Sequence, residues 1–546
     1  MKKKYFSIAT IMLICIMLFA SCGGQISLAE EQVLRTAVAT DPKTIDPQRA
    51  ENETAFLVIS NVMEGLVRIN HQGEVEPALA QSWTVSEDGL VYTFVLRDAL
   101  WSDATPIVAA DIEHSMKRAL DSSFFSKYAY QMFIIKNAYE AKYKMDRAGN
   151  ASSVSSADIG IHAVDDKTLQ ITLNEPAAYF PKLLANPVFI PSQKNATVLG
   201  GASYGNSLAN YVFSGPYVIT EWASEARISL EKNPSYWDAD KVHLTHITID
   251  IDKQTSNSVG QFQQGIYDVI QIPQSFVSQF TDKKEYRQVP DTTTWFLQFN
   301  CKNPYFANVK IRQAFALAVD KEAFINQVRK GLGIEAHSLS HPLMIIEENA
   351  SLEDEKKELV PLAFNKEEAN RLLDEGLAEI GAGREQLVEN VQFLGGEGEM
   401  WQSISAYFVQ QVSDVFALTL TVTPANDIQR YNLLKGGQYA LTYSGIESDF
   451  YDPASSLEIL QSANSNNFSY FVNEVYDAAI AKIKTQQAER KTAVMEAEKI
   501  LASEVPLYPI CYSVYTYAVQ QDVKNLSAMP TPSRFDWKYT YIEKTK

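Results

Sequence analysis

Catalytic signatures are missing from this sequence, and the residues that most often build metal and redox sites are scarce. Only four cysteines and seven histidines occur in 546 residues, and they form neither a CxxC nor an HExxH motif. There is no P-loop and no GxGxxG motif after a predicted strand, which argues against the common phosphate- and dinucleotide-binding sites. No pair of carboxylates stands out as a general acid and base. We therefore predict a protein that is not an enzyme and that holds no cofactor or metal ion.

Basic residues are fewer than acidic ones. The chain has 48 basic and 66 acidic residues, a formal net charge of -18 at pH 7, and no stripe of basic residues. Such a surface repels phosphate backbones, so we expect no binding to nucleic acid. With 46% hydrophobic residues, the chain can bury a large core, and its length predicts two or three packed lobes.

Long apolar runs are confined to the N-terminus. Lys2–Lys4 form a basic segment, Tyr5–Phe19 is apolar, and two small residues precede Cys22. This order is typical of a secretory signal peptide, and the residues before Cys22 resemble a bacterial lipobox. We expect residues 1–21 to be the signal peptide, Cys22 to carry the lipid anchor, and residues 22–33 to form a tether. An ordinary cleaved signal and an uncleaved anchor are the alternatives, although a spanning helix needs about 20 apolar residues.

Two cysteines, Cys301 and Cys511, remain in the predicted folded part. A disulfide between them is permitted outside the cytoplasm, and two separate buried thiols are the alternative. Their positions along the chain do not decide between the two.

Strand and helix patterns alternate along the chain. Apolar residues recur at every second position in 169–173 and 247–251, which predicts strands with one buried face. In 493–501 they recur at helical spacing. The sequence therefore predicts a mixed α/β architecture.

Four ordered blocks of residues carry a more specific signal. They are Ala80–Trp83 with Trp101–Asp103, then Ser214–Tyr217 with Lys232–Pro234, then Phe299–Phe306 with Arg312–Lys321, and finally Asp449–Pro453. In this order, between about residue 34 and residue 520, they resemble the oligopeptide- and dipeptide-binding receptors of ABC transporters, family 5 of the bacterial solute-binding proteins.

The resemblance implies a bilobal α/β fold of the periplasmic-binding-protein type II class with an extra inserted N-terminal domain. Lobe I would comprise residues 34–63, 188–291 and 513–546, the inserted lobe II residues 64–187, and lobe III residues 292–512. The two connections between lobes I and III would form a hinge. An extended peptide would lie in the cleft and pair its backbone with strands, as in β-augmentation.

The resemblance also implies the site residues. Asp449 would hold the terminal ammonium of the peptide, because a charged terminus enclosed in a cleft needs an opposite charge. The other ligand-binding residues would be Gly445, Ile446 and Glu447 on a pairing strand, with Glu51, Tyr128 and Tyr512 lining the cleft. The alternative role for Asp449 is to cap a turn before Pro453, for which Asp452 is the better candidate.

The group that would hold the peptide carboxylate is left open. Neither Tyr439–Tyr443 nor Gly395–Glu399 contains the basic residue that receptors for short peptides use there. Arg430 and Lys435 are nearby candidates, with solvated surface residues as the alternative. We therefore do not expect strict selection for length.

The resulting hypothesis is a monomeric receptor that is lipid-anchored in the cell envelope, outside the cytoplasm, in the periplasm or at the cell surface. It would deliver oligopeptides to ABC permease subunits with their cytoplasmic ATPases. Two alternatives remain. The same fold could bind another solute, such as a metal chelate, haem or an oligosaccharide, or the protein could act mainly as a surface adhesin or signalling receptor.

Overall fold

The computed structural model describes residues 27–70, 73–341, 344, 359, 362–485, 487–528 and 534–544. The predicted signal peptide and Cys22 lie outside the described residues. Among the described helices, none combines the length and the apolar character that crossing a membrane requires.

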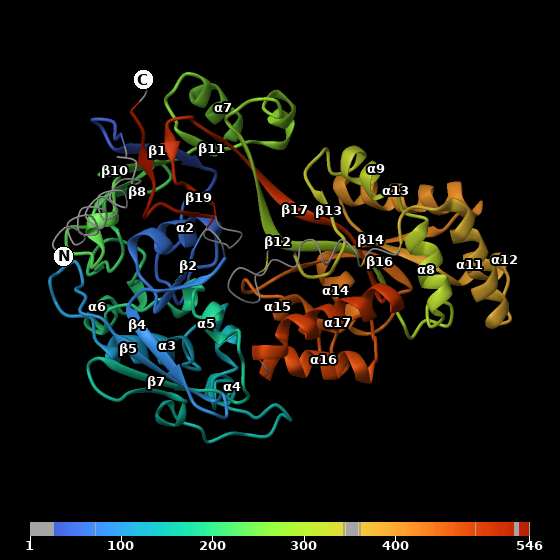
Figure 1. Cartoon of the computed structure of the whole chain (residues 1–546), viewed down its shortest axis with the longest axis horizontal. Coiled ribbons are helices and arrows are strands. Elements are labelled where there is room, and N and C mark those ends of the chain that lie inside the picture. The colour runs from blue at the N-terminus through green and yellow to red at the C-terminus, as the bar shows by residue number, and fades with distance from the viewer. Residues whose placement is uncertain are drawn as a thin grey trace, which may run out of the picture.

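Three packed parts are visible in Figure 1, and we keep the names lobe I, lobe II and lobe III for the residue ranges predicted above. One mixed sheet of eleven strands runs through lobes I and III in the order β15, β14, β16, β12, β17, β11, β1, β10, β9, β8, with β13 pairing beside β17. Its strands are β1 (Val33–Val38), β8 (Tyr217–Ala223), β9 (Arg227–Lys232), β10 (His246–Ile251), β11 (Val269–Gln271), β12 (Tyr286–Phe299), β13 (Ile334–Glu335), β14 (Gln392–Gly396), β15 (Thr421–Ala425), β16 (Leu441–Glu447) and β17 (Leu507–Val519).

Lobe I is built around β1, which pairs in parallel with β10 and β11. The predicted strand at 247–251 is confirmed as β10, and Ile247 and Ile249 are fully buried because alternate side chains face the core. The other elements are α2 (Glu53–Val62), α6 (Lys194–Gly200), α7 (Thr255–Gln263), β18 (Val523–Lys524), β19 (Ser527–Ala528), β20 (Phe535–Asp536) and β21 (Tyr541–Ile542).

Lobe II has its own four-stranded antiparallel sheet in the order β4, β5, β7, β6. Phe94 of β5 and Leu169 and Ile171 of β7 share a core with Ile112 and Met116 of α3, which confirms the strand predicted at 169–173. The elements of this lobe are β2 (Val67–Ile69), β3 (Val75–Pro77), β4 (Ala80–Val85), β5 (Val91–Leu96), α3 (Ala109–Ala119), the short 3-10 helix η1 (Ala129–Met132), α4 (Ala138–Tyr143), β6 (Ile161–Ala163), β7 (Thr168–Thr172) and α5 (Phe180–Leu183).

Lobe III packs helices against β14, β15 and β16, and its core includes Phe315, Phe324 and Phe408. The apolar spacing at 493–501 falls within α17, as predicted. Its helices are α8 (Val309–Leu317), α9 (Lys321–Gln327), α11 (Lys366–Glu379), α12 (Arg384–Asn390), α13 (Glu399–Phe416), α14 (Asp427–Lys435), α15 (Ala454–Leu457), α16 (Glu474–Thr485) and α17 (Arg490–Glu504).

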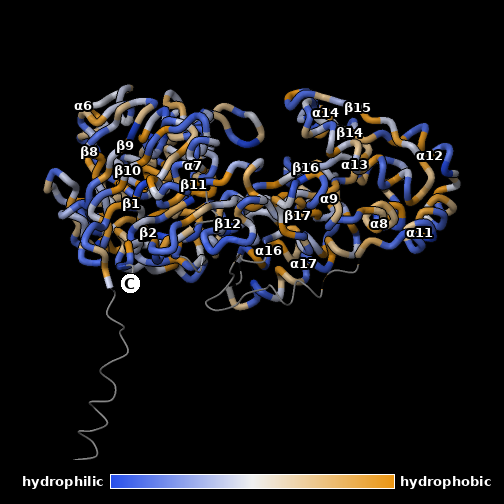
Figure 2. Tube along the Cα trace, turned by 90° about the horizontal axis from the view of Figure 1, so that it is seen from above, coloured by the Kyte–Doolittle hydropathy of each residue, from blue (hydrophilic) through white to orange (hydrophobic). Residues whose placement is uncertain are grey.

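Lobes I and III are joined by the long antiparallel pair β12 and β17, which Figure 2 shows crossing between the two bodies. The register of this pair shifts between Pro290 and Thr294, where β12 carries extra residues relative to β17. The boundaries predicted after residues 291 and 512 fall at this irregular stretch, and the boundaries themselves stay a prediction.

Cys301 and Cys511 are both free thiols in the structure, so the two-thiol alternative describes this conformation. Cys511 is buried on β17, where burial raises the pKa of its thiol.

Candidate ligand-binding site

One edge of β16 is open along its C-terminal half. The backbone N–H of Ser448 donates to the carbonyl of Thr292 at 3.2 Å, so the backbone of Ser448 faces β12. Because backbone groups alternate along a strand, those of Gly445 and Glu447 face the opposite edge. There β14 pairs with only the first two residues of β16. In the described part of the chain, Gly445 and Glu447 thus have no strand partner on this edge, which could accept an added strand.

Close packing under the open edge explains the glycine at position 445. A Cβ atom on Gly445 would lie 2.8 Å from Cε3 of Trp295, the residue opposite on β12. Trp295 cannot easily move, because its ring stacks on Tyr443 at 5.3 Å and its indole N–H donates to Ser513 Oγ at 2.7 Å. Only glycine fits here without displacing the Trp295 ring.

Asp449 follows this edge and is fixed from two sides. Its backbone N–H donates to Ser455 Oγ at 2.8 Å, and Asn186 Nδ2 of lobe II donates to its carbonyl at 2.7 Å. The Tyr130 hydroxyl, also from lobe II, donates to its carboxylate. Burial raises the pKa of the Asp449 carboxyl, and hydrogen bonds from Tyr130 and Gln131 offset part of that rise.

The Asp449 carboxylate keeps capacity for a ligand. A carboxylate offers about four lone-pair positions, of which Tyr130 and Gln131 each occupy one. Asp449 as a whole residue is exposed to solvent, although its surroundings desolvate the carboxyl enough to raise its pKa. The arrangement can therefore accept hydrogen bonds from an ammonium group that arrives along the open edge of β16.

Three of the predicted carboxylates act electrostatically on the hydroxyl of Tyr128, another predicted site residue. Burial raises the pKa of Tyr128, and the negative charges of Glu447, Asp449 and Glu51 raise it further. The ring also contacts Phe56 of α2, with ring centroids 5.5 Å apart. Tyr128 of lobe II thus contacts lobe I and is within the electrostatic influence of carboxylates of lobe III.

The two remaining predicted residues, Ile446 and Tyr512, are less exposed to solvent. Ile446 is half-buried between Gly445 and Glu447. Tyr512 is only 2% exposed, and its hydroxyl donates to the carbonyl of Ser338 at 3.0 Å. In this conformation Tyr512 therefore belongs to the interior of lobe III and is not brought to the open edge.

Sequence reasoning missed Tyr130 and Asn186, which contact Asp449 directly. The resemblance pointed to Tyr128, two residues before Tyr130, and the neighbouring tyrosine carried no separate signal. Asn186 has no motif around it that would have distinguished it from a loop asparagine.

Residues 74–468 match the family model described as bacterial extracellular solute-binding proteins, family 5, middle region. The chain belongs to this family. The predicted resemblance is thereby confirmed.

Family 5 relatives match over almost the whole chain. The oligopeptide-binding protein OppA of Bacillus subtilis (strain 168) is 28% identical over 567 residues, covering 99% of this chain and 100% of the relative.

Solved structures agree with the bilobal fold. The unliganded open form of MppA, a periplasmic murein tripeptide binding protein, superposes with a TM-score of 0.82 at 24% identity, covering 95% of this chain and 99% of that one. OppA of Listeria monocytogenes bound to peptide gives a TM-score of 0.68 at 27% identity, covering 95% and 100%. The predicted type II fold with an inserted domain is confirmed.

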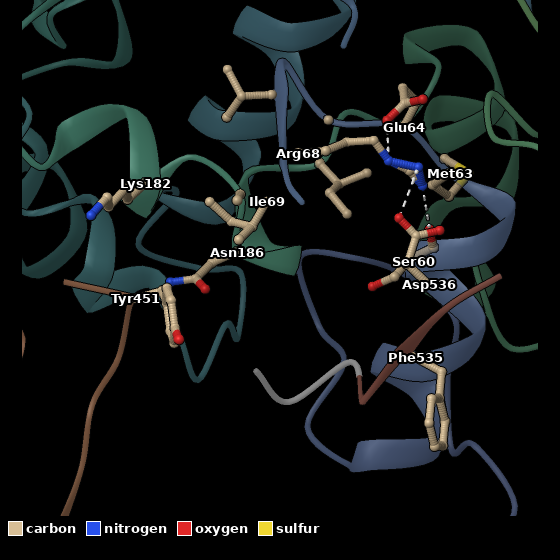
Figure 3. A pocket seen from close by; sticks show the side chains of 14 residues that line it. Ser60, Met63, Glu64, Arg68, Ile69, Lys182, Asn186, Tyr451, Phe535 and Asp536 are labelled. Atoms are coloured by element: carbon tan, nitrogen blue, oxygen red, sulfur yellow. Dashed lines mark hydrogen bonds and ion pairs between the residues drawn. The ribbon is translucent and has the colours of Figure 1, made fainter. Parts of the chain in front are cut away.

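A pocket of this family 5 protein is lined by Asn186, whose side chain donates to the carbonyl of Asp449, and Figure 3 shows Asn186 and Tyr451 close together on one side of it. On the other side Arg68 forms ion pairs with Glu64 at 3.3 Å and with Asp536 at 3.5 Å. Burial opposes the charge of Arg68, but these two carboxylates outweigh it and raise its pKa. Because these charged groups pair with one another across lobes I and II, we assign the cluster to the packing between the lobes.

Proposed function

We propose that this chain is the substrate-binding subunit of an ABC importer for peptides. It binds extended oligopeptides between lobes I and III and delivers them to permease subunits with their cytoplasmic ATPases. The observation that carries the proposal is the open edge of β16, which ends at the accessible carboxylate of Asp449. An unpaired edge recognises a peptide backbone whatever its sequence, and the carboxylate recognises its free amino terminus.

The ligand class follows from the charge at this site. Glu51, Glu447 and Asp449 all place negative charge at the Tyr128 hydroxyl, so the site favours a cationic group and disfavours an anion. A peptide ammonium meets both requirements, whereas an oligosaccharide supplies neither a backbone strand nor a positive charge. Peptide binding is therefore preferred over the other solutes considered from the sequence.

The proposal also includes the cellular location of the protein. We infer a monomer outside the cytoplasm, in the periplasm or at the cell surface, held by a lipid on Cys22 after removal of residues 1–21. Membership of a family of extracellular solute-binding proteins supports this location. Catalysis has no part in the proposal.

Calorimetry tests the function directly. The chain from Gly23 onward would be unfolded and refolded to remove carried-over ligand, then titrated with a mixed-sequence library of short peptides and with its N-acetylated counterpart. We expect the free peptides to bind and the acetylated ones to lose about two or more decades of affinity, since acetylation removes the ammonium. Absence of binding by both libraries would refute the peptide assignment, and equal binding would refute the role of Asp449 alone.

Closure of the cleft is expected to accompany binding. We propose that β12 and β17 act as the hinge between lobes I and III, because their register breaks between Pro290 and Thr294. The higher TM-score against an open form than against a peptide-bound relative supports an open resting arrangement. Small-angle X-ray scattering should show a smaller radius of gyration with saturating peptide than without it. An unchanged radius with bound peptide would contradict the hinge.

A further inference from the structure

A separate cavity lies within lobe III, where the end of α17 meets the start of β17 and the first residue of α9. Its volume is about 40 Å³, and none of its described lining residues belongs to the open edge of β16. The wall is mostly apolar and includes the buried side chains of Leu501, Val505 and Leu507. Ala502 and Pro509 of the wall are half-buried, so the cavity lies near the surface of the lobe. The polar residues that line it are Lys321, His337, Ser338 and Glu498.

Lys321, the first residue of α9, brings a buried ammonium group to this wall. The residue is only 6% exposed, and burial lowers the pKa of its amine to about 8. Its Nζ donates to the carbonyl of Ala336 at 2.8 Å and lies 4.3 Å from the centroid of the Tyr508 ring. Lys321 forms no ion pair within the described residues, and the charge of Glu335 offsets only part of the effect of burial. The cation therefore lacks a bound counter-ion.

The other carboxylate in the cavity wall does not neutralise this cation. Glu498 of α17 accepts the backbone N–H groups of Leu339 and Ser340 at 3.1 and 2.9 Å, and the Ser340 hydroxyl at 2.5 Å. These neutral donors hold Glu498 to the loop that follows β13. The pKa of Lys321 is raised by Glu335 and by Cys511 but not by Glu498.

The hydrogen bond to Ala336 does not account for the charge of Lys321. A backbone carbonyl is a neutral acceptor, which an uncharged donor would satisfy without the cost of burying an ammonium group. Of the three N–H donors of this group, only one has a hydrogen-bond acceptor in the part of the chain that the structure describes. An anion in the cavity would supply the opposite charge and further acceptors.

The size of the cavity limits this anion. A water-sized group needs about 10–15 Å³ of such volume, so the cavity holds about three or four groups of this size. The two oxygens of a carboxylate occupy part of that space, which leaves room for a short hydrocarbon tail against the apolar wall. Acetate and propionate match these limits, whereas a peptide is too large.

We propose that this cavity of lobe III is a second ligand site, in which the ammonium group of Lys321 binds the carboxylate of a short monocarboxylic acid and the apolar wall contacts its tail. The site shares no described lining residue with the open edge of β16, so the proposal does not depend on the proposed function. A neutral amide of the same shape lacks the charge that pairs with Lys321 and should bind weakly.

Calorimetric titration of the ligand-free chain from Gly23 onward with propionate and with propionamide tests the site. At pH 7 the wild-type protein should bind propionate about ten- to a hundredfold more tightly than propionamide, because the hydrogen bond then joins two charged groups. In Lys321→Met, which keeps a long apolar side chain without the charge, the ratio should fall to about one. Lys499→Met, which removes an exposed lysine of α17, should leave the ratio unchanged.

Proton uptake gives a second readout, which needs no variant. A bound carboxylate favours the protonated amine and raises the pKa of Lys321 above its ligand-free value of about 8. Binding at pH 9 should therefore take up a substantial fraction of one proton, whereas binding at pH 7, where the amine is already largely protonated, should take up much less. Titrations in two buffers with different ionisation enthalpies measure this uptake.

Several results would overturn the proposal. They are no saturable binding of propionate to the wild-type protein, equal binding of propionate and propionamide, equal proton uptake at the two pH values, or an unchanged ratio in Lys321→Met. Thermal melting verifies that both variants fold, and if Lys321→Met does not, the amide comparison and the proton uptake of the wild-type protein decide. Because no peptide enters these titrations, their outcome is independent of the proposed function.

Discussion

Replacing Asp449 with asparagine is expected to weaken the binding of peptides with a free amino terminus by a factor of about a hundred to several thousand. Leaving one member of a buried charge pair without its partner costs about 3–5 kcal/mol, and about 1.4 kcal/mol corresponds to a tenfold change in affinity. The fold should be retained, because an asparagine oxygen can still accept the hydrogen bond from Tyr130. Calorimetry with one peptide measures the loss.

Two controls make this test specific. Asp282→Asn changes an exposed carboxylate far along the chain from β16 and should leave the affinity unchanged. N-acetylated peptides should bind wild-type and Asp449→Asn proteins with similar affinity, because they lack the ammonium. If Asp449→Asn binds free peptides as the wild type does, Asp449 has a structural role in its loop and does not anchor the ligand.

The same carboxylate predicts a pH dependence. A protonated Asp449 no longer attracts an ammonium, so affinity should fall as the pH falls through the pKa of this residue. Because burial raises that pKa above the ordinary value of about 3.9, the decline should begin at a higher pH than for an exposed aspartate. The pKa of Glu447 is raised by burial and by Asp291, in the same direction. In Asp449→Asn, the part of the decline due to Asp449 should be absent.

Local patterns and ordered blocks were enough to predict the fold. Alternating isoleucines at 247–251 indicated β10 because one face of that strand meets the core. The block that begins at Asp449 indicated the position of the site because its loop follows the strand with the open edge. The resemblance also named Glu51, Tyr128, Glu447 and Asp449 as site residues, and in the structure the three carboxylates raise the pKa of Tyr128.

Contacts between distant segments could not be predicted in the same way. Tyr130 reaches Asp449 across 319 residues, from a different lobe, and no spacing in the sequence encodes that contact. Arg430 could be named as a candidate but not distinguished from a solvated residue, since its hydrogen bonds to Thr442 and Ser444 of β16 depend on the fold. Tyr512 lies on β17, where the placement of Ser338 determines that its hydroxyl faces the interior.

Removing the carboxylate of Asp452 should destabilise the protein by about 3–5 kcal/mol. Asp452 is 0% exposed on its side chain, and it pairs with Arg490 of α17 at 2.6 Å and with Lys182 of lobe II at 3.2 Å. It also accepts the N–H of Ala454 at 3.0 Å, as predicted for the turn-forming aspartate of this block. Asp452→Ala leaves Arg490, which is 1% exposed, as a buried cation without its partner. Chemical denaturation of the ligand-free protein measures the loss.

Two further variants, one of a surface ion pair and one with apolar replacements, test whether the unpaired buried charge causes the loss of stability. Asp374→Ala removes an exposed ion pair with Arg384 at 2.8 Å and should cost less than about 1 kcal/mol. The double variant Asp452→Leu with Arg490→Met should recover part of the loss, because it removes the unpaired charge of Arg490, whereas Lys182 still loses its pairing with Asp452. Burial alone would raise the pKa of Asp452, but Lys182 and Arg490 outweigh it and lower the pKa. The stabilisation is thus present above about pH 4 and lost as the pH falls through this depressed value, whereas Asp452→Ala should lack that acid-dependent part. Equal losses for Asp452→Ala and Asp374→Ala would show that the buried network contributes no more than a surface pair.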